Sequence, residues 1–307
     1  MTKRQGNRLL KLYIKYPLEA VLLAIFFVFV SVLPIDAASG VGGFLGRTLG
    51  PKLSATRRAD RNLRLAFPEK SDPELADIIR GMWDNLGRVA AEYPHLDRIT
   101  APDADRVEVV NPEHIYKLTK NGSSAILVGG HLGNWEIGSI VAVRLGIDLT
   151  LVVREPNNKL SQKIIDHYRC SVNSKRIKKG RQGARQALVI LRRGGVLGLL
   201  FDQKMNDGIP VTFFGGEAMT AAAPAQLAIR LGCPLVPVRV ERLRGARFRI
   251  TCYPPVERVY SADRRTEAGI LMRKLNEMLE DWIRERPEQW LWLHRRWPEE
   301  TYRAAGL

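Results

Sequence analysis

Residues 124–138 read SAILVGGHLGNWEIG and decide the fold class. The segment begins with a short apolar run, passes through two glycines into a polar loop, and ends in residues that open a helix. An apolar run without alternation, bounded by glycine, is typical of a strand that is buried on both faces. A strand followed directly by a helix is the repeating unit of an α/β fold.

Similar apolar runs recur along the chain, each bounded by Gly, Pro or Asp, and helical patterns separate them. The runs are DLTLVVR (148–154), GGVLGLLFD (194–202) and CPLVPVRV (233–240), and helices are predicted near 73–92, 135–145, 158–168, 183–193, 221–231 and 262–286. The helix over 73–92 follows a start signal at Ser71 and Asp72. FRITCY (248–253) is predicted as an edge strand. These patterns predict an α/β fold with a mixed, mostly parallel sheet covered by helices.

One apolar segment stands apart from this pattern. Residues 20–33, AVLLAIFFVFVSVL, contain no charge and only Ser31 as a polar residue. A cleaved signal peptide, a buried core helix and a membrane anchor are the competing interpretations. The following residues, PIDA, make a poor cleavage site, and a core helix would show a polar stripe. A membrane anchor is therefore the preferred prediction.

The anchor carries basic residues on both sides. Its apolar run is shorter than the roughly 18 to 20 residues that span a bilayer. The flanking cations are Lys3, Arg4, Arg8, Lys11 and Lys15 before it and Lys52, Arg57, Arg58, Arg61 and Arg64 after it. A marginal span and a helix that enters one leaflet are the alternatives, and the second, with both flanks on the cytoplasmic surface, satisfies these charges better. We expect residues 1–46 to form a basic arm and membrane anchor, and residues 47–307 to form the catalytic domain.

The charge balance narrows the class of partner. The chain has 48 Lys and Arg against 32 Asp and Glu, a formal net charge of +16. Such a surplus suits nucleic acid, anionic lipid or an acidic carrier protein, and the apolar segment favours the last two. Three cysteines, Cys170, Cys233 and Cys252, are odd in number and form no CxxC pair, so neither a disulfide framework nor a zinc site is predicted. A reducing compartment is expected.

His131 is the first candidate catalytic residue. It follows a strand at the sheet edge where open α/β sheets carry their active sites. Imidazole takes up a proton near neutral pH, and a carboxylate within reach can orient the ring. Glu136, five positions later, is the carboxylate expected to do this; a helix-capping Glu beside a structural His fits the same spacing. Asn134 and Trp135, between them, are candidate substrate contacts.

A second group of candidates follows the strand at 194–202. Asp202 ends that strand and is predicted to be catalytic or ligand-orienting, with a structural Asp bound to Arg as the alternative. In VTFFGGEAMT (211–220), Phe213, Phe214 and Gly215 are candidate substrate contacts, with core packing as the alternative for the aromatic pair. Residues 168–185, YRCSVNSKRIKKGRQGAR, contain basic residues and no acid, which suits either an anion site or a solvated face.

Several segments together resemble a known family. The chain resembles the late lipid A acyltransferases, which transfer lauroyl and myristoyl chains and belong to the wider H-x4-D/E glycerolipid acyltransferases. The segments that carry the resemblance are, in order, HLGNWE (131–136), GRQGARQALVILRRGGVLGLLFDQ (180–203), VTFFGGEAMT and RPEQWLWLHRRW (286–297). The segment ATRRADRNLRLAFPEKSDPE (55–74) is similar as well. The resemblance spans nearly the whole chain.

The resemblance implies roles for individual residues. His131 would deprotonate the acceptor hydroxyl, Glu136 would orient it, and Asp202 and Arg169 would match the family's functional aspartate and arginine, with Arg154 as the other candidate for that arginine. The loop after Asp202 departs from the family pattern, since Thr212 stands where a proline usually precedes the two phenylalanines. This departure bears on acceptor or chain-length preference more than on catalysis.

The resemblance also implies substrates and a location. A fatty acyl chain would pass from acyl carrier protein or coenzyme A to a hydroxyl of a lipid A precursor, an anionic glycolipid, in lipopolysaccharide biosynthesis on the cytoplasmic face of the bacterial inner membrane. Acylation of a phosphatidylinositol mannoside or an ornithine lipid, and thioester hydrolysis, are the alternatives. The chain contains no G-x-S-x-G elbow, which favours direct attack by the acceptor. Neither a metal nor a nucleotide cofactor is predicted, because His pairs at i,i+4, a P-loop and a Rossmann fingerprint are lacking.

Overall fold

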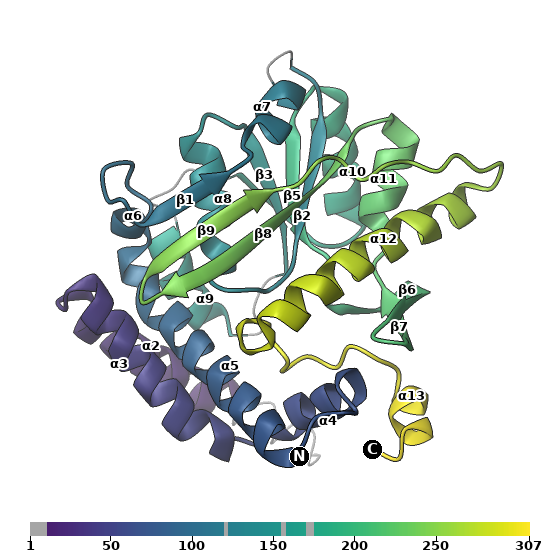
Figure 1. Cartoon of the computed structure of the whole chain (residues 1–307). Helices are drawn as coiled ribbons and strands as arrows, with labels where there is room; N and C mark the ends of the chain where they lie inside the picture. The colour runs from purple at the N-terminus through teal and green to yellow at the C-terminus, as the bar shows by residue number, and fades with distance from the viewer. Residues whose placement is uncertain (1–10, 120–121, 155–157, 170–174) are drawn as a thin grey trace.

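A seven-stranded sheet forms the centre of the molecule (Figure 1). The structure, a computed structural model, describes residues 11–119, 122–154, 158–169 and 175–307, so Lys3, Arg4, Arg8 and Cys170 lie outside the described residues. The strand order is β1-β9-β8-β2-β5-β3-β4. All neighbouring strands are parallel except the antiparallel pair β8–β9, which confirms the mixed, mostly parallel sheet. The strands are β1 (Val107–Val110), β2 (Ala125–Gly129), β3 (Leu149–Val153), β4 (Lys175–Lys178), β5 (Val196–Leu200), β8 (Leu235–Arg244) and β9 (Arg247–Cys252).

Strand β2 shows why its apolar run is continuous. Ile126 and Val128 belong to the core on one face of the sheet, whereas Ala125 and Leu127 belong to the core on the other face. All four side chains are buried. The first core includes residues of α10 (Arg181–Arg192), α11 (Ala223–Leu231) and α12 (Arg264–Glu285), and the second includes residues of α6 (Leu96–Ile99), α7 (Glu113–Thr119) and α8 (Trp135–Arg144). Helices therefore cover both faces, as predicted.

The predicted helices are confirmed, with ends that differ by one to a few residues. The helix expected over 73–92 is α5 (Asp72–Glu92). It begins with a capping box in which Glu74 accepts hydrogen bonds from the backbone N–H and hydroxyl of Ser71. The helix expected near 158–168 is α9 (Lys159–Arg169), which connects β3 to β4.

Two details of the sheet differ from the prediction. FRITCY forms β9, which is an interior strand because β1 pairs with its outer side in parallel. Neither β1 nor β4 was predicted, since the short sequences VEVV and KRIK are not continuously apolar. The region after Asp202, expected as a loop, forms a separate antiparallel hairpin of β6 (Lys204–Phe213) and β7 (Gly216–Thr220).

The N-terminal helices lie beside α5 (Figure 1). They are η1 (Lys11–Lys15), α2 (Tyr16–Ser31), α3 (Ile35–Leu49), η2 (Gly50–Lys52) and α4 (Thr56–Ala66). Within the described part of the chain, Leu12–Ser31 is the segment long and apolar enough to cross a membrane by length and composition. In α2 only Ala20, Phe27 and Val30 are buried. Large exposed apolar side chains cover the rest of this helix and part of α3: Leu18, Val21, Leu22, Ile25, Val28, Phe29, Phe44, Leu45 and Leu49.

This exposure argues against the interpretation of residues 20–33 as a buried core helix. The predicted division after residue 46 falls inside α3 and stays a prediction. Helix α3 packs closely on α5, because a Cβ at Gly42 would lie 2.3 Å from the carbonyl oxygen of Gly87. Glycine at both positions lets the two backbones approach.

The C-terminal segment returns toward the carboxyl edge of the sheet. After α12 the chain forms η4 (Pro287–Gln289) and ends in α13 (Glu299–Ala304), while η3 (Tyr93–His95) connects α5 to α6. Trp290, Trp292 and Trp297 are buried. Trp290 forms a β-bridge with Leu132, which places the C-terminal segment directly against the loop that carries His131.

Candidate active site

His131 and Asp202 lie together because their strands are neighbours. Strands β2 and β5 pair in parallel, with Gly129 opposite Leu200. His131 and Asp202 each follow two positions after these paired residues. The two loops therefore leave the carboxyl edge of the sheet at the same level, where open α/β sheets place their chemistry.

Asp202 accepts two hydrogen bonds from His131, one from its backbone and one from its ring. The backbone N–H of His131 donates to Oδ2 of Asp202 at 2.7 Å, and Nδ1 of the ring lies 2.7 Å from Oδ1. The indole N–H of Trp290 donates to Oδ2 at 2.8 Å. Burial alone would raise the pKa of Asp202, but the charge of His131 and these hydrogen bonds lower it to about 2. An ionised Asp202 only accepts hydrogen bonds, so Nδ1 carries the proton and Nε2 of neutral His131 keeps its lone pair.

The Nε2 atom of His131 faces a polar and aromatic environment. The side-chain amide nitrogen of Gln203 lies 3.3 Å from Nε2. The ring centroids of Trp135 and His294 lie 5.2 Å and 6.3 Å from that of His131. Partial burial and the charge of His131 lower the pKa of His294. The nitrogen that would accept a proton is thus held in place beside the amide of Gln203, which a reacting hydroxyl would have to replace as its hydrogen-bond partner.

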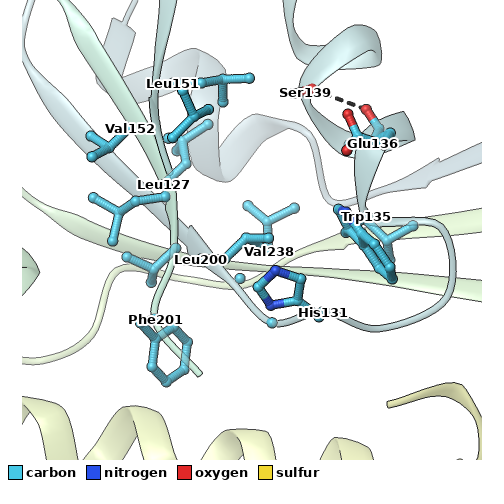
Figure 2. A pocket seen from close by; sticks show the side chains of 18 of the residues that line it. Leu127, His131, Trp135, Glu136, Ser139, Leu151, Val152, Leu200, Phe201 and Val238 are labelled. Atoms are coloured by element: carbon cyan, nitrogen blue, oxygen red, sulfur yellow. Dashed lines mark hydrogen bonds between the residues drawn. The ribbon is translucent and has the colours of Figure 1, made fainter. Parts of the chain in front are cut away.

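Glu136 does not orient His131, contrary to the prediction. Its carboxylate accepts a hydrogen bond from Nε of Arg169 at 2.9 Å and a second one from the same guanidinium. It also accepts a hydrogen bond from the hydroxyl of Tyr93 at 2.9 Å. Figure 2 shows its side chain well separated from the imidazole. The reason is topological: the neighbouring strand supplies Asp202 to the ring, while Glu136 lies in the first turn of α8 and faces α9.

Tyr93 and Arg169 complete this second cluster. The guanidinium of Arg169 donates to the hydroxyl of Tyr93 at 3.0 Å and lies over its ring. Burial and the charge of Glu136 raise the pKa of Tyr93, so the phenol stays protonated. Burial alone would lower the pKa of Arg169, but Glu136 and Tyr93 raise it. The cluster fixes an ion pair of Arg169 and Glu136 in the wall of the cavity that His131 also lines.

A cavity of about 510 Å³ extends from His131 along the sheet. Its walls are mainly apolar and come from the sheet and from α8 (Figure 2): Leu127, Leu149, Leu151, Val238, Val240, Gly138 and Ala142. Four basic residues also line it: Arg154, Arg169, Arg176 and Lys179. Burial and the charge of Arg154 lower the pKa of Lys179. Such a cavity suits an extended apolar chain that ends in a polar, anionic carrier.

Trp135, a predicted substrate contact, and Arg154, the other candidate for the family's arginine, line this cavity. Asn134 does not, because it is fully buried. Its side chain accepts the backbone N–H of Glu136 and donates to Glu92 at 2.8 Å. Asn134 therefore caps α8 and holds the loop in place, and it is not open to substrate.

Phe213, Phe214 and Gly215 also differ from the prediction. Phe213 and Phe214 are buried and pack in edge-on contact with each other at the tip of the β6–β7 hairpin. Both rings lie against the buried tryptophans of the C-terminal segment. The backbone N–H of Phe214 donates to Glu280, so it is not an open amide. Phe213 and Phe214 form core structure, which was the alternative interpretation of the aromatic pair, whereas Gly215 is exposed and does not line the cavity.

A buried ion pair between α5 and β8 supports the loop that carries His131. Glu92 is fully buried and accepts from the guanidinium of Arg242 at 3.0 Å. Arg242 also donates to Asn85, whose amide donates to the carbonyl of Gly133 at 2.9 Å. Asn85 and Glu92 of α5 bond directly to the loop, and Arg242 of β8 holds both of them, so the loop is fixed from outside its own sequence.

Sequence reasoning missed several residues of this site. Gln203 and Trp290 stand in the segments that carried the family resemblance, DQ and RPEQW, so their position was available as a signal. Tyr93 and Glu92 lie at the end of a predicted amphipathic helix, where nothing in the local pattern separates them from ordinary helix residues. Among the described residues, no group of three or more His, Cys, Asp or Glu is arranged to hold a metal ion.

Comparisons with known proteins identify the family of the chain. The family described as "Bacterial lipid A biosynthesis acyltransferase" matches residues 8–299. The chain is 26% identical to the "Lipid A biosynthesis myristoyltransferase" of Escherichia coli K12 over 82% of this chain and 77% of that protein. It is 26% identical to the "Lipid A biosynthesis palmitoleoyltransferase" of the same organism, over 90% and 89%.

Another relative has a different printed substrate. The chain is 25% identical to the "Phosphatidylinositol mannoside acyltransferase" of Mycolicibacterium smegmatis, over 68% of this chain and 70% of that protein. All three relatives are acyltransferases by name. With the match over nearly its whole length, the chain belongs to the bacterial lipid A biosynthesis acyltransferase family and is an acyltransferase.

Proposed function

We propose that this acyltransferase moves a fatty acyl chain from a thioester to a hydroxyl of a lipid A precursor at the cytoplasmic face of the bacterial inner membrane. The observation that carries the proposal is the His131–Asp202 pair at one end of an apolar cavity, in which Asp202 accepts one hydrogen bond from the ring of His131 and one from its backbone N–H. A base beside a channel for an alkyl chain is the combination that acyl transfer to a hydroxyl requires.

The reaction follows from this geometry. The acceptor hydroxyl gives its proton to Nε2 of His131 while its oxygen attacks the thioester carbonyl carbon. The negative charge that develops on the carbonyl oxygen needs donors in the water-poor site, and the amide of Gln203 lies beside the reacting atoms for this task. The tetrahedral intermediate then breaks its carbon–sulfur bond, and the departing thiolate takes the proton from His131. Asp202 stabilises the imidazolium that forms in between.

The basic residues of the cavity support a donor with an anionic carrier. Arg154, Arg176 and Lys179 line the cavity together with its apolar wall. The thioester donor class, acyl carrier protein or acyl-coenzyme A, carries phosphate at the head of the chain. A cationic rim would hold this phosphate and leave the alkyl chain in the apolar part. We propose acyl carrier protein as the first donor to test and coenzyme A as the second.

Membrane association is proposed from the N-terminal helices. The exposed side chains of α2 and α3 form an apolar surface that water does not favour. Asn158, at the start of α9, donates to the backbone carbonyl of Tyr16 and to Glu19, so α2 is attached to the catalytic part of the chain. A helix held against the protein on one side and apolar on the other is suited to lie in one leaflet.

The test is an assay of the purified full-length protein in detergent. Acyl carrier protein and coenzyme A donors are each paired with a lipid A precursor, with a phosphatidylinositol mannoside and with no acceptor, and products are identified by mass spectrometry. We expect acylated lipid A precursor and none with His131→Ala. Acylation of the mannoside alone would instead support the second candidate function, which the mycobacterial relative favours. Release of free fatty acid without an acylated lipid would indicate a thioesterase.

A further inference from the structure

A second cavity lies next to the active site. It has a volume of about 410 Å³ and lies between α4, α5 and the C-terminal segment. Arg58, Leu86, Leu291, Leu293 and Arg295 line it. The lining includes two arginines and no acidic residue, together with three leucines. This composition suits a ligand that is both anionic and apolar.

Two residues line both cavities: Trp135 and His294. They are also the two aromatic residues whose rings lie 5.2 Å and 6.3 Å from the ring of His131. The two cavities therefore share a wall made by these two aromatic residues, which lie beside His131.

A two-substrate transfer needs this arrangement. The donor carbonyl and the acceptor hydroxyl must both reach His131, but their alkyl chains cannot occupy the same channel. The first cavity is the larger of the two, about 510 Å³ against 410 Å³, and its wall is mainly apolar with four basic residues. The second cavity then remains for the acceptor. Its lining residue Arg58 follows the exposed Leu49 and Leu53 closely in the sequence.

The charges of the second cavity are suited to bind phosphate. Arg58 is exposed on α4. Arg295 is 60% exposed and lies 3.4 Å from Glu299, which leaves most of its donors open. Guanidinium groups bind phosphate through two parallel hydrogen bonds. Leu86, Leu291 and Leu293 offer apolar contact beside them.

We infer that this second cavity binds the acceptor lipid, with a phosphate of its headgroup between Arg58 and Arg295 and its apolar part on the three leucines. The acceptor hydroxyl reaches His131 between Trp135 and His294. This inference rests on the proposed function, which it extends by assigning the acceptor site and by requiring a phosphorylated acceptor.

Arg58→Gln and Arg295→Gln test the assignment in the purified full-length protein. Arg57→Gln is the matched control, since Arg57 is the exposed neighbour of Arg58 on α4 and does not line the cavity. The acceptors are a phosphorylated lipid A precursor and the same lipid after phosphatase treatment. We expect the KM for the phosphorylated acceptor to rise about tenfold or more in both variants, as loss of a charge-assisted hydrogen bond predicts. The KM for the donor and kcat should stay within about twofold of the wild-type values, and the melting temperature should stay within about 2 °C.

The phosphatase-treated acceptor gives the decisive comparison. The wild type and Arg57→Gln should prefer the phosphorylated lipid, and the two cavity variants should lose this preference. Retention of the preference in Arg58→Gln and Arg295→Gln overturns the inference and leaves the proposed function standing. Arginine-dependent acylation of a different phosphorylated lipid, such as a phosphatidylinositol mannoside, supports the acceptor site and overturns the proposed acceptor.

A membrane phospholipid offers the same phosphate chemistry as the acceptor. Binding of each variant to vesicles of phosphatidylglycerol and phosphatidylcholine separates the two sources. We expect Arg58→Gln and Arg295→Gln to bind these vesicles as tightly as Arg57→Gln does. Weaker vesicle binding in the cavity variants, with an unchanged preference for the phosphorylated acceptor, would assign the two arginines to the bilayer surface and overturn the inference.

Discussion

The carboxylate of Asp202 accepts both the backbone N–H and the ring Nδ1–H of His131, each at 2.7 Å. The first bond fixes the loop and the second fixes the ring, so a single buried side chain determines both the position and the tautomer of the base. Trp290 holds the carboxylate in turn. This places the C-terminal segment in the catalytic arrangement, about 90 residues after the strand that carries Asp202.

Asp202→Asn is expected to abolish most of the activity. The substitution keeps the volume of the side chain but removes the charge that selects the Nδ1–H tautomer and stabilises the imidazolium. We expect kcat to fall by about 100-fold or more, with a small change in the KM for either substrate. Steady-state kinetics with the acyl carrier protein donor would measure this. A variant with more than about a tenth of the wild-type kcat would remove Asp202 from the mechanism.

The same residue predicts a dependence of stability on pH. The pKa of Asp202 is about 2 in the folded protein against an ordinary value of 3.8. A carboxylate with a lowered pKa stabilises the folded state above its unfolded pKa, and this contribution is lost as the pH falls toward the folded pKa. The wild type should therefore be more stable than Asp202→Asn at pH 5, and this difference in unfolding free energy should shrink by about 1 kcal/mol between pH 5 and pH 3. Urea titrations of both proteins would measure it, and a gap that widens on acidification would contradict the prediction.

Glu136 is expected to act through Arg169 and not through His131. Glu136→Gln removes the charged partner of Arg169, and Arg169→Gln removes the other half of the same pair. In a double-mutant cycle on the unfolding free energy we expect a coupling of about 1–3 kcal/mol between these two substitutions. Glu136→Gln and Asp202→Asn should instead be additive within about 0.5 kcal/mol, because they belong to separate clusters. Strong coupling between Glu136 and Asp202 would restore the role that the sequence spacing suggested.

The difference between these two carboxylates shows where sequence reasoning stops. The strands β2, β5 and β8 were predictable because burial on both faces requires continuous apolar runs, and this also placed His131 and Asp202 at strand ends. Which strands are neighbours is a property of the sheet order, and no local spacing contains it. Glu136 is near His131 in sequence, but one turn of α8 and the buried cap Asn134 direct it toward Arg169.

Charged and turn-forming segments were harder for a related reason. The strand β4, KRIK, has one buried residue, Ile177, so its pattern indicates no strand without the neighbouring β3. The pair Phe213 and Phe214 has the composition of a ligand wall, but the tryptophans that cover it lie some 80 residues later in the chain. Their burial depends on the return of the C-terminal segment, which sequence patterns alone did not predict.

Phe27 is expected to link the N-terminal helix to the active site. Its ring is buried, stacks on Tyr93 at 5.8 Å and meets Tyr168 edge-on at 5.1 Å. Phe27→Ala should lower the unfolding free energy by about 3 kcal/mol and reduce kcat, since Tyr93 loses the neighbour that holds it against Glu136. Thermal denaturation and kinetics in detergent would measure both.

Phe29→Ala is the matched control on the same helix. Phe29 is 51% exposed, so its removal should change the unfolding free energy by less than about 0.5 kcal/mol. If α2 lies in the bilayer, the same substitution should weaken binding to lipid vesicles by roughly tenfold, because a Phe side chain contributes about 2 kcal/mol of burial. Equal effects of the two substitutions on stability would show that α2 does not pack as described.

The size of the first cavity predicts a change of chain-length preference. Ala142 lies in α8 on the cavity wall and is 8% exposed, so a larger side chain there has no solvent to enter. Ala142→Leu would add three carbon atoms to the wall opposite the sheet and displace the far part of a long acyl chain. We expect kcat/KM for a fourteen-carbon donor to fall by about tenfold, since each methylene group that loses its apolar contact costs about 0.8 kcal/mol. A ten-carbon donor, which does not reach the enlarged side chain, should keep its kcat/KM within about twofold and serves as the internal control for folding. Equal losses for both donors would show that the alkyl chain does not lie along α8.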